Sequence, residues 1–282
     1  MLLCLATIGD TISTSPTSPA NMGGAIDSTL TPVGPIFIDH QDTIGQGETN
    51  VNVLAQTDEM ELVTHTGVDL SVRATTVVVA ASHGLTDKLD LSLVLPVIQE
   101  TVDVHVTGPL VGHTTVGFSG PGDLALRLKY RLLPGLAALL KATFPTGNPQ
   151  SGLGTGDYFL SPGLAASTTL GPFQLNAFAT YNVDLSIPRK SSLSYGTGVA
   201  TLFAPWLGGA VEFLAESGSG AADPLIILGT DYSQQHTFAL AFGLRAVLPH
   251  DLMLFAAGTY ALNHGGLRAR GVFPTVGIGG RF

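Results

Sequence analysis

The most regular alternation of apolar and polar positions lies between Asp123 and Leu132. One set of alternate positions is apolar, and its members are Leu124, Leu126, Leu128, Tyr130 and Leu132. The other set is Asp123, Ala125, Arg127, Lys129 and Arg131. Successive side chains of a β-strand leave opposite faces, so a period of two predicts a strand with one apolar face. A half-buried strand of a soluble protein gives the same alternation.

The residues after this strand favour a barrel. Leu133-Pro134-Gly135 predicts a tight turn, because Pro fixes φ and Gly accepts positive φ. A second strand follows over 136–144, and Pro145-Thr146-Gly147 opens a long loop rich in Gly, Asn and Ser. Short turns at one end and long loops at the other are typical of transmembrane β-barrels.

Similar reasoning along the whole chain predicts twelve strands joined by five short turns and six longer loops. Their ranges are 48–63, 70–83, 89–106, 123–132, 136–144, 157–169, 173–187, 193–204, 209–217, 236–247, 252–262 and 268–282. Residues 108–121 are expected to be a Gly-rich loop, and a β-bulge is expected near 96–100, where the alternation changes phase. The predicted fold is all-β, a transmembrane antiparallel up-and-down β-barrel of about 12 strands (range 10–14), with both termini periplasmic. A soluble all-β sandwich is the alternative.

Composition supports the membrane interpretation. Mean hydropathy is +0.36 and 12% of residues are charged, against roughly 25% in soluble proteins. No apolar run approaches the ~18–20 residues of a spanning helix, which leaves a closed barrel as the way to cross lipid. The net charge of −9, with 12 Lys and Arg, argues against nucleic-acid binding. Cys4 is the single cysteine, which excludes an intrachain disulfide.

Three regions follow from these patterns. Residues 1–20 are a candidate truncated signal peptide, with a disordered polar tail as the alternative. Residues 21–47 are expected to be extended, either on the periplasmic side or inside the lumen. Residues 48–282 are expected to form the barrel. Phe282 ends the chain in a pattern similar to the C-terminal aromatic signature recognised by the barrel-assembly machinery, although Gly280 departs from it.

The chain resembles an outer-membrane barrel family associated with the meta-cleavage pathway of phenol degradation, often labelled "transporter". The motifs that carry the resemblance lie at 34–37, 43–47, 89–96, 122–127, 144–147 and 152–156. It covers most of the chain from about residue 30. The resemblance implies a Gram-negative outer-membrane barrel with a role in the passage of small compounds, aromatic ones among them.

No strong catalytic pattern is evident. Ser82-His83 is the one adjacent Ser and His pair, and it is expected to be an ordinary pair beside a short turn. The eight histidines show no i, i+2 or i, i+4 pairing of the kind that metal sites favour. The GLGTG stretch at 152–156 lacks the helix and the Lys-Ser/Thr of a phosphate loop. We therefore predict no enzyme activity, no cofactor and no metal.

The polar face of the strands predicts the candidate site. A charge on the lipid face would cost ~2–4 kcal/mol near the bilayer midplane, so charged residues should face the lumen. The pore-lining candidates are Asp90, Asp123, Arg127, Lys129, Arg131, Lys141, Glu212, Glu216 and Arg245. They could form a charged lining that sets selectivity, or an ion-pair network that fills the barrel. The membrane-interface aromatic candidates are Tyr130, Phe144, Tyr158, Phe173, Tyr181, Phe203 and Trp206.

These expectations favour an outer-membrane channel or facilitated-diffusion barrel for small solutes, hydrophobic or aromatic ones included. The alternative is a structural or adhesive barrel whose loops, especially 218–235, contact partners. A lipid hydrolase of the outer membrane is the least favoured hypothesis. The expected partners are outer-membrane lipid and lipopolysaccharide, the assembly machinery and the solute.

Overall fold

The computed structural model describes Gly34 and residues 36–37, 39–63, 68–106, 112–186, 191–219, 234–264, 268–269 and 272–282. The predicted signal peptide and most of the predicted loop 218–235 lie outside these residues. In the described part, no helix is long and apolar enough to cross a membrane.

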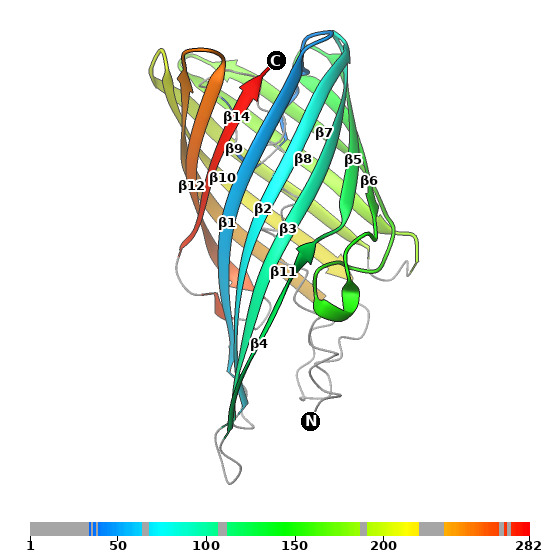
Figure 1. Cartoon of the computed structure of the whole chain (residues 1–282). Helices are drawn as coiled ribbons and strands as arrows, with labels where there is room; N and C mark the ends of the chain where they lie inside the picture. The colour runs from blue at the N-terminus through cyan, green and yellow to red at the C-terminus, as the bar shows by residue number, and fades with distance from the viewer. Residues whose placement is uncertain are drawn as a thin grey trace.

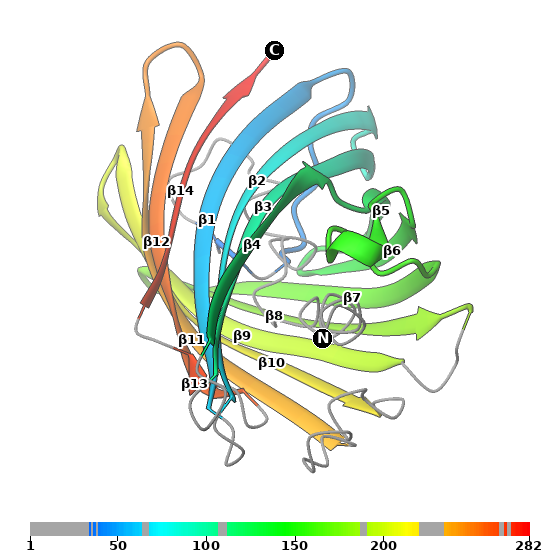
Figure 2. The same ribbon diagram turned by 60° about the horizontal axis from the view of Figure 1, so that its bottom comes forward.

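Twelve antiparallel strands close into a ring, as Figures 1 and 2 show. Around the ring they are β1 (Thr49–Val63), β2 (Val68–Thr86), β3 (Leu89–Val106), β5 (Leu124–Leu133), β6 (Leu136–Phe144), β7 (Phe159–Leu170), β8 (Phe173–Asp184), β9 (Ser192–Ala204), β10 (Leu207–Ser219), β11 (Gln234–Leu248), β12 (Leu252–His264) and β14 (Val272–Arg281). The two-residue strand β13 (Arg268–Ala269) pairs with the far end of β1. The predicted antiparallel barrel of about 12 strands is confirmed.

The first and last strands close the ring. β1 pairs with β2 along its whole length, and its residues 50–56 pair with residues 275–281 of β14. The backbones of Thr49 and Phe282 exchange two hydrogen bonds, of 2.8 and 3.1 Å, beside this seam. Ring closure leaves no free edge along this seam, which lipid requires of a sheet that crosses it.

An additional strand, β4 (Gly112–Pro121), lies where the sequence predicted a Gly-rich loop. It pairs with residues 97–106 of β3, and β5 then pairs with residues 89–94 of the same strand. β4 and β5 therefore share one position in the wall and are separated by Gly122 and Asp123. The prediction of a loop over 108–121 was wrong for residues 112–121. Pairing with β3 supplies the backbone partners of this segment despite its three glycines and a proline.

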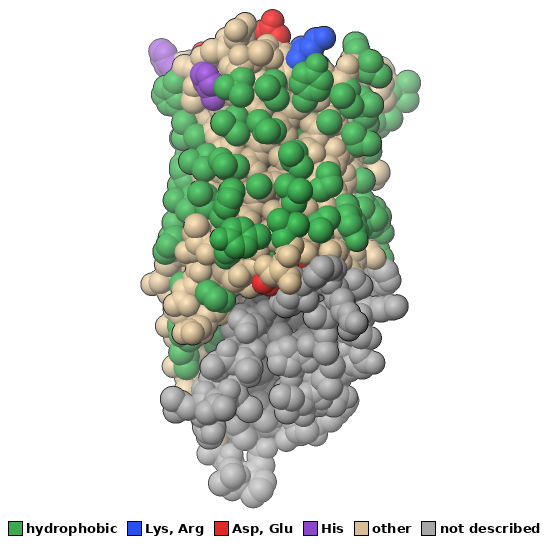
Figure 3. All heavy atoms as spheres, turned by 90° about the vertical axis from the view of Figure 1, so that its right-hand side faces the viewer, with side chains coloured by type: hydrophobic (Ala, Val, Ile, Leu, Met, Phe, Trp, Pro, Cys, Tyr) green, Lys and Arg blue, Asp and Glu red, His purple; other side chains and the backbone are tan. Residues whose placement is uncertain are grey.

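Side chains alternate between an outer apolar face and the lumen. Leu126, Leu128 and Tyr130 of β5 are exposed on the outside, whereas Arg127 and Lys129 between them are buried. Figure 3 shows apolar side chains covering one face of the barrel wall, with charged and His side chains at the rim that carries the short turns. Such a surface suits lipid, because water would leave a large apolar area exposed.

The predicted bulge near 96–100 is absent. The register between β2 and β3 runs unbroken from Val68↔Val106 to Gly84↔Asp90. Val102 therefore lies on the same inner face as Val94 and Glu100, and all three are buried. The phase change in the sequence reflects an inner face that becomes apolar toward the long-loop end, not an extra residue.

Candidate functional site: the occupied lumen

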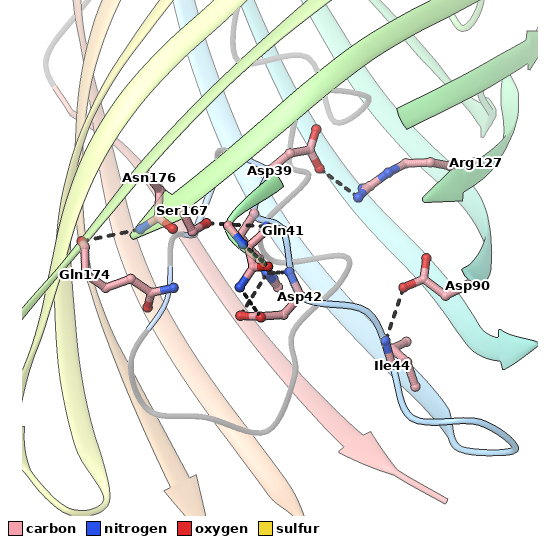
Figure 4. A network of polar contacts seen from close by, with 11 residues as sticks. Asp39, Gln41, Asp42, Ile44, Asp90, Arg127, Ser167, Gln174 and Asn176 are labelled. Atoms are coloured by element: carbon pink, nitrogen blue, oxygen red, sulfur yellow. Dashed lines mark hydrogen bonds and ion pairs between the residues drawn. The ribbon is translucent and has the colours of Figure 1, made fainter. Parts of the chain in front are cut away.

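A stretch that precedes β1 lies inside the barrel. It comprises Gly34, Ile36, Phe37 and residues 39–46, and we call it the inner segment. Near the short-turn rim it is fixed by backbone bonds: the Gly47 N–H donates to the Gly84 carbonyl at 2.8 Å, and the Gly84 N–H donates to the Glu48 carbonyl at 3.0 Å. A Cβ at position 84 would overlap the Gly45 carbonyl, so this approach requires glycine. From there the inner segment runs into the lumen (Figures 2 and 4).

Ile36 and Phe37 fill an apolar section of the lumen. Their side chains are 2% and 3% exposed. They belong to one buried cluster with inward-facing residues of seven strands, namely Leu54, Val78, Ala80, Val94, Ala125, Leu214, Ala239, Ala241, Met253 and Phe255. Gly243 lacks the Cβ that would overlap the Ile36 side chain. The side chains of Ile36 and Phe37 thus pack into an apolar part of the lumen.

One carboxylate of the wall holds the backbone of these two residues. Glu212 of β10 accepts hydrogen bonds from the Ile36 N–H through Oε1 and from the Phe37 N–H through Oε2, the latter at 2.9 Å. Arg245 of β11 is an electrostatic neighbour of Glu212 and lies against Gly34. Hydrogen bonds to an ionised acceptor are about twice as strong as neutral ones. Glu212 is therefore a principal anchor of the inner segment.

An ion pair joins the inner segment to β5. The Asp39 carboxylate lies 2.7 Å from Nη2 of Arg127, and both groups are largely buried (Figure 4). Lys129 and Lys141 are further electrostatic neighbours of Asp39. Lys129 also neighbours Asp90, and Lys141 neighbours Glu216. Asp39 thus lies among cationic side chains of the wall, and Arg127 is its ion-pair partner.

His40 is fully enclosed in the lumen. Burial lowers the pKa of His40 well below 6.5, and the positive charges of Lys129 and Arg245 act in the same direction. Its Nδ1 accepts a hydrogen bond of 3.2 Å from the Asp42 N–H, which requires an unprotonated nitrogen. His40 is therefore neutral when the inner segment is docked.

Further polar contacts fix the rest of the inner segment, and Figure 4 shows them. The Gln41 N–H lies 3.4 Å from Oγ of Ser167 on β7, and Oε1 of Gln41 accepts the Gly135 N–H at 3.0 Å. The Ile44 N–H donates to Oδ2 of Asp90 on β3 at 3.2 Å. Contacts to strands on several sides of the ring hold the inner segment across the lumen.

The structure brings together most of the predicted pore-lining residues. Asp90, Arg127, Lys129, Glu212 and Arg245 are buried on the inner face and surround the inner segment. Lys141 and Glu216 are partly buried beside them, and Glu216 accepts a hydrogen bond of 2.7 Å from Ser192. Arg131 differs from the expectation: it lies at the rim and donates to the Asp87 carbonyl at 2.7 Å, because its strand ends there.

Asp123 also has a different role from the one predicted. It lies in the break between β4 and β5 and anchors the loop 145–158. Its carboxylate accepts the N–H groups of Gly147 at 3.0 Å and Thr155 at 2.7 Å, and the Thr155 hydroxyl at 2.8 Å. A cavity of about 400 Å³ lies between β4 and this loop, lined among others by Phe118 and Leu153. Asp123 therefore fixes the loop that flanks the unpaired edge of β4.

Six of the seven aromatic candidates are exposed outside. Tyr130, Phe173, Phe203 and Trp206 lie near short turns, and Tyr158 and Tyr181 lie near long loops. Phe144 is instead only partly exposed, because its ring packs edge-on against Tyr158 with centroids 6.4 Å apart. Phe282 is exposed at the short-turn end, beside the seam between β1 and β14.

Ser82 and His83 do not form a catalytic pair. Ser82 faces inward and donates to the Ser92 hydroxyl at 2.8 Å, whereas Nδ1 of His83 contacts the Thr49 hydroxyl at 2.9 Å. Adjacent residues of a strand point to opposite faces, which separates the two side chains. Among the side chains that the structure describes, no group of three or more His, Cys, Asp or Glu could hold a metal ion.

Sequence reasoning missed Ile36 and Phe37 as parts of the site. Residues 21–47 show no sustained period, so the pattern could not decide between the periplasmic side and the lumen as their location. The available signal was a short apolar pair followed by Asp39 and His40, in a chain whose predicted lumen carried unbalanced charges.

Comparisons with known proteins agree with this architecture. The chain shares 18% identity with the COG4313 outer membrane channel from Pseudomonas putida F1, with a TM-score of 0.61 over 86% of this chain and 98% of that one. With the translocator domain of autotransporter NalP from Neisseria meningitidis it shares 11% identity and a TM-score of 0.55, over 86% of this chain and 91% of that one. With the Ralstonia pickettii toluene transporter TbuX the chain shares 12% identity and a TM-score of 0.51, over 93% of this chain and 100% of that one. At these identities the likeness is one of fold.

No curated protein matches the chain. A family model does match, over residues 41–266, and its description is "Putative MetA-pathway of phenol degradation". The match spans β1 to β12 and part of the inner segment. The chain belongs to this family.

Proposed function

We propose that this chain is an outer-membrane channel through which small apolar solutes, aromatic ones among them, cross. The observation that carries the proposal is the apolar cluster around Ile36 and Phe37 in the middle of the lumen. A lumen built for polar solutes is lined by polar side chains and filled with water. An apolar section instead favours solutes that lose little on leaving water.

The inner segment acts as the gate. Ile36 and Phe37 occupy the apolar section, so a solute can pass only when they leave it. Their anchors are a few polar contacts to Glu212, Arg127 and Ser167. The backbone bonds between Gly47 and Gly84 lie at the rim and can remain in place. The inner segment can therefore swing out without any strand of the barrel being unpaired.

The long-loop end offers an apolar entrance. Val102 faces inward there, and Phe118 of β4 lines the cavity beside the loop 145–158. In outer-membrane barrels the longer loops face the outside, which makes this end the side of entry. The family description, with its reference to phenol degradation, is in keeping with an aromatic solute. The separation of Ser82 from His83 favours a passive conduit over a hydrolase.

Uptake of the apolar fluorescent probe N-phenyl-1-naphthylamine tests this function. Intact Gram-negative cells that express the chain should take up the probe several-fold faster than cells with an empty vector. Folding of the barrel is checked by the different gel migration of boiled and unboiled samples. Equal uptake with a correctly folded barrel would contradict the proposal and favour the structural or adhesive alternative.

A further inference from the structure

The inner segment presents two chemical groups to the lumen wall, close together in sequence. The aromatic ring of Phe37 lies in the apolar cluster. Two residues later, the carboxylate of Asp39 binds Arg127 at 2.7 Å. Residues i and i+2 of any chain are at most about 7 Å apart, from Cα to Cα. The docked inner segment thus places a benzene ring and a carboxylate within one small region of the pore.

The wall is complementary to both groups. The ring lies among side chains that include Leu54, Leu214, Met253 and Phe255. The carboxylate lies beside Arg127, with Lys129 and Lys141 as further cationic neighbours. The wall carboxylates of this group, Asp90 and Glu216, neighbour Lys129 and Lys141 respectively. When the inner segment leaves, Arg127 loses the Asp39 carboxylate that lies 2.7 Å from it.

Loss of one partner of a buried ion pair is costly, so another carboxylate should replace Asp39. A guanidinium is suited to this, because its planar fork matches a carboxylate and remains charged. A neutral hydrocarbon fills the apolar section and does not replace the Asp39 carboxylate on Arg127. A free ring that carries its own carboxylate would satisfy both parts of the wall.

We propose that the lumen contains a binding site for small aromatic carboxylates, in which the ring takes the place of Phe37 and the carboxylate takes the place of Asp39 on Arg127. This inference rests on the proposed function and names a solute class within it. The inner segment is then a tethered competitor of the solute, and binding of the solute favours release of the inner segment. Phe37 and Asp39 lie two residues apart, so the ligand chosen for the test joins a ring and a carboxylate by a short flexible chain, as in 3-phenylpropanoate.

Isothermal titration of the full chain in detergent micelles tests the site. The background is Asp39→Asn, which removes the tethered carboxylate with little change in size. The ligands are 3-phenylpropanoate, its neutral analogue 3-phenylpropanol, and propanoate, which has the charge without the ring. We expect the Asp39→Asn protein to bind 3-phenylpropanoate at least tenfold more tightly than either of the other two.

The double variant Asp39→Asn/Arg127→Gln should lose this preference, so that acid and alcohol bind with similar affinity. The matched control is Asp39→Asn/Arg73→Gln, because Arg73 is exposed and pairs with Glu59 at 3.3 Å, away from the inner segment. The control should retain the full preference. All three proteins lack Asp39, so none of them forms the ion pair between Asp39 and Arg127. The comparison is therefore free of any difference in docking that this ion pair would cause.

Two results would overturn the inference. One is equal binding of acid and alcohol to the Asp39→Asn protein, and the other is a preference for the acid that survives Arg127→Gln. If the alcohol binds as tightly as the acid, the result supports the apolar channel and contradicts the carboxylate site. If neither binds and uptake of N-phenyl-1-naphthylamine is also unchanged, the proposed function itself fails.

Discussion

The backbone N–H of Phe37 donates a hydrogen bond of 2.9 Å to Glu212 of β10, which lies 175 residues farther along the chain. The same carboxylate accepts the N–H of Ile36. One side chain of β10 thus satisfies two donors of an irregular backbone inside the lumen, where water is scarce. The two residues that fill the apolar section of the pore are therefore held through their backbones as well as through their buried side chains.

Replacement of Glu212 should open the channel. Glu212→Ala removes two charge-assisted hydrogen bonds, each worth about 1.5–3 kcal/mol. Since 1.4 kcal/mol is a factor of ten in an equilibrium, the open population should rise at least tenfold, measured as open probability in planar bilayers. Glu59→Gln is the control, because Glu59 pairs with the exposed Arg73 instead. Equal open probabilities for Glu212→Ala and the control would argue against anchoring by Glu212.

Truncation of Phe37 should create a site that an added aromatic molecule can fill. Phe→Ala in a packed cluster leaves a cavity and costs about 3–5 kcal/mol, so docking of the inner segment should weaken. Toluene should then raise the melting temperature of the Phe37→Ala protein, because a ligand that binds the folded state stabilises it. The wild-type protein, with the space occupied by Phe37, should show a smaller shift. Identical shifts in both proteins would contradict an apolar cavity at this position.

Protonation of His40 should favour release of the inner segment. The pKa of docked His40 lies well below 6.5, so the docked state resists protonation while a released His40 accepts a proton near pH 6.5. The contribution of His40 to docking is therefore complete above pH 6.5 and decreases as the pH falls below it. Asp39 acts in the opposite direction, because burial raises the pKa of its docked carboxyl to about 6. The other charged groups around His40 are Asp42, Lys129 of β5 and Arg245 of β11.

The measurement is open probability between pH 7.5 and pH 5. On acidification it should rise more, or fall less, for the wild-type protein than for His40→Asn, which retains the effect of Asp39. Asn cannot take up the proton, and its side-chain oxygen can accept the Asp42 N–H in place of Nδ1. Superimposable pH profiles would show that His40 does not contribute.

Asp123 should control the order of the loop 145–158. Asp123→Ala removes three acceptor contacts, so the amides of Gly147 and Thr155 should lose their protection in hydrogen exchange. Amides of β10 and β11 should be unaffected in the same sample. The control is Asp103→Asn, an exposed carboxylate of β3 that accepts from Thr115. Retained protection at Gly147 and Thr155 would rule out Asp123 as the anchor of the loop.

The strands were predictable because lipid and lumen impose a strict alternation. β5 illustrates this: its leucines and Tyr130 face outward, and Arg127 and Lys129 face inward, as its pattern alone indicates. β4 was missed because Gly117, Gly120 and Pro121 weaken its alternation. Its backbone partners come from β3, and the local pattern of apolar and polar residues does not reveal which strands pair. The bulge in β3 was wrongly predicted because periodicity does not reveal that the inner face is also apolar around Val102.

The site was predictable in part. The alternation along the strands correctly placed Arg127, Glu212 and Arg245 on the inner face, because a charge on the lipid face is so costly. The same alternation could not show that their partners come from the inner segment, since residues 21–47 have no period that fixes their position. The structure shows an ion pair between Arg127 and Asp39, so a partner of the charged wall residues comes from the inner segment and not from another strand.

The central claim, that the inner segment must leave the lumen for solute to pass, can be tested by tethering it. The pair Gln41→Cys/Ser167→Cys, in a Cys4→Ser background, joins two positions that lie close together, since the backbone N–H of Gln41 is 3.4 Å from Oγ of Ser167. Uptake of N-phenyl-1-naphthylamine is then compared under oxidising and reducing conditions, with each single-cysteine protein as control. We predict that the oxidised pair falls to the level of the empty vector and that reduction restores uptake, while the single-cysteine proteins do not respond. Uptake that is unchanged by a verified cross-link would contradict the account.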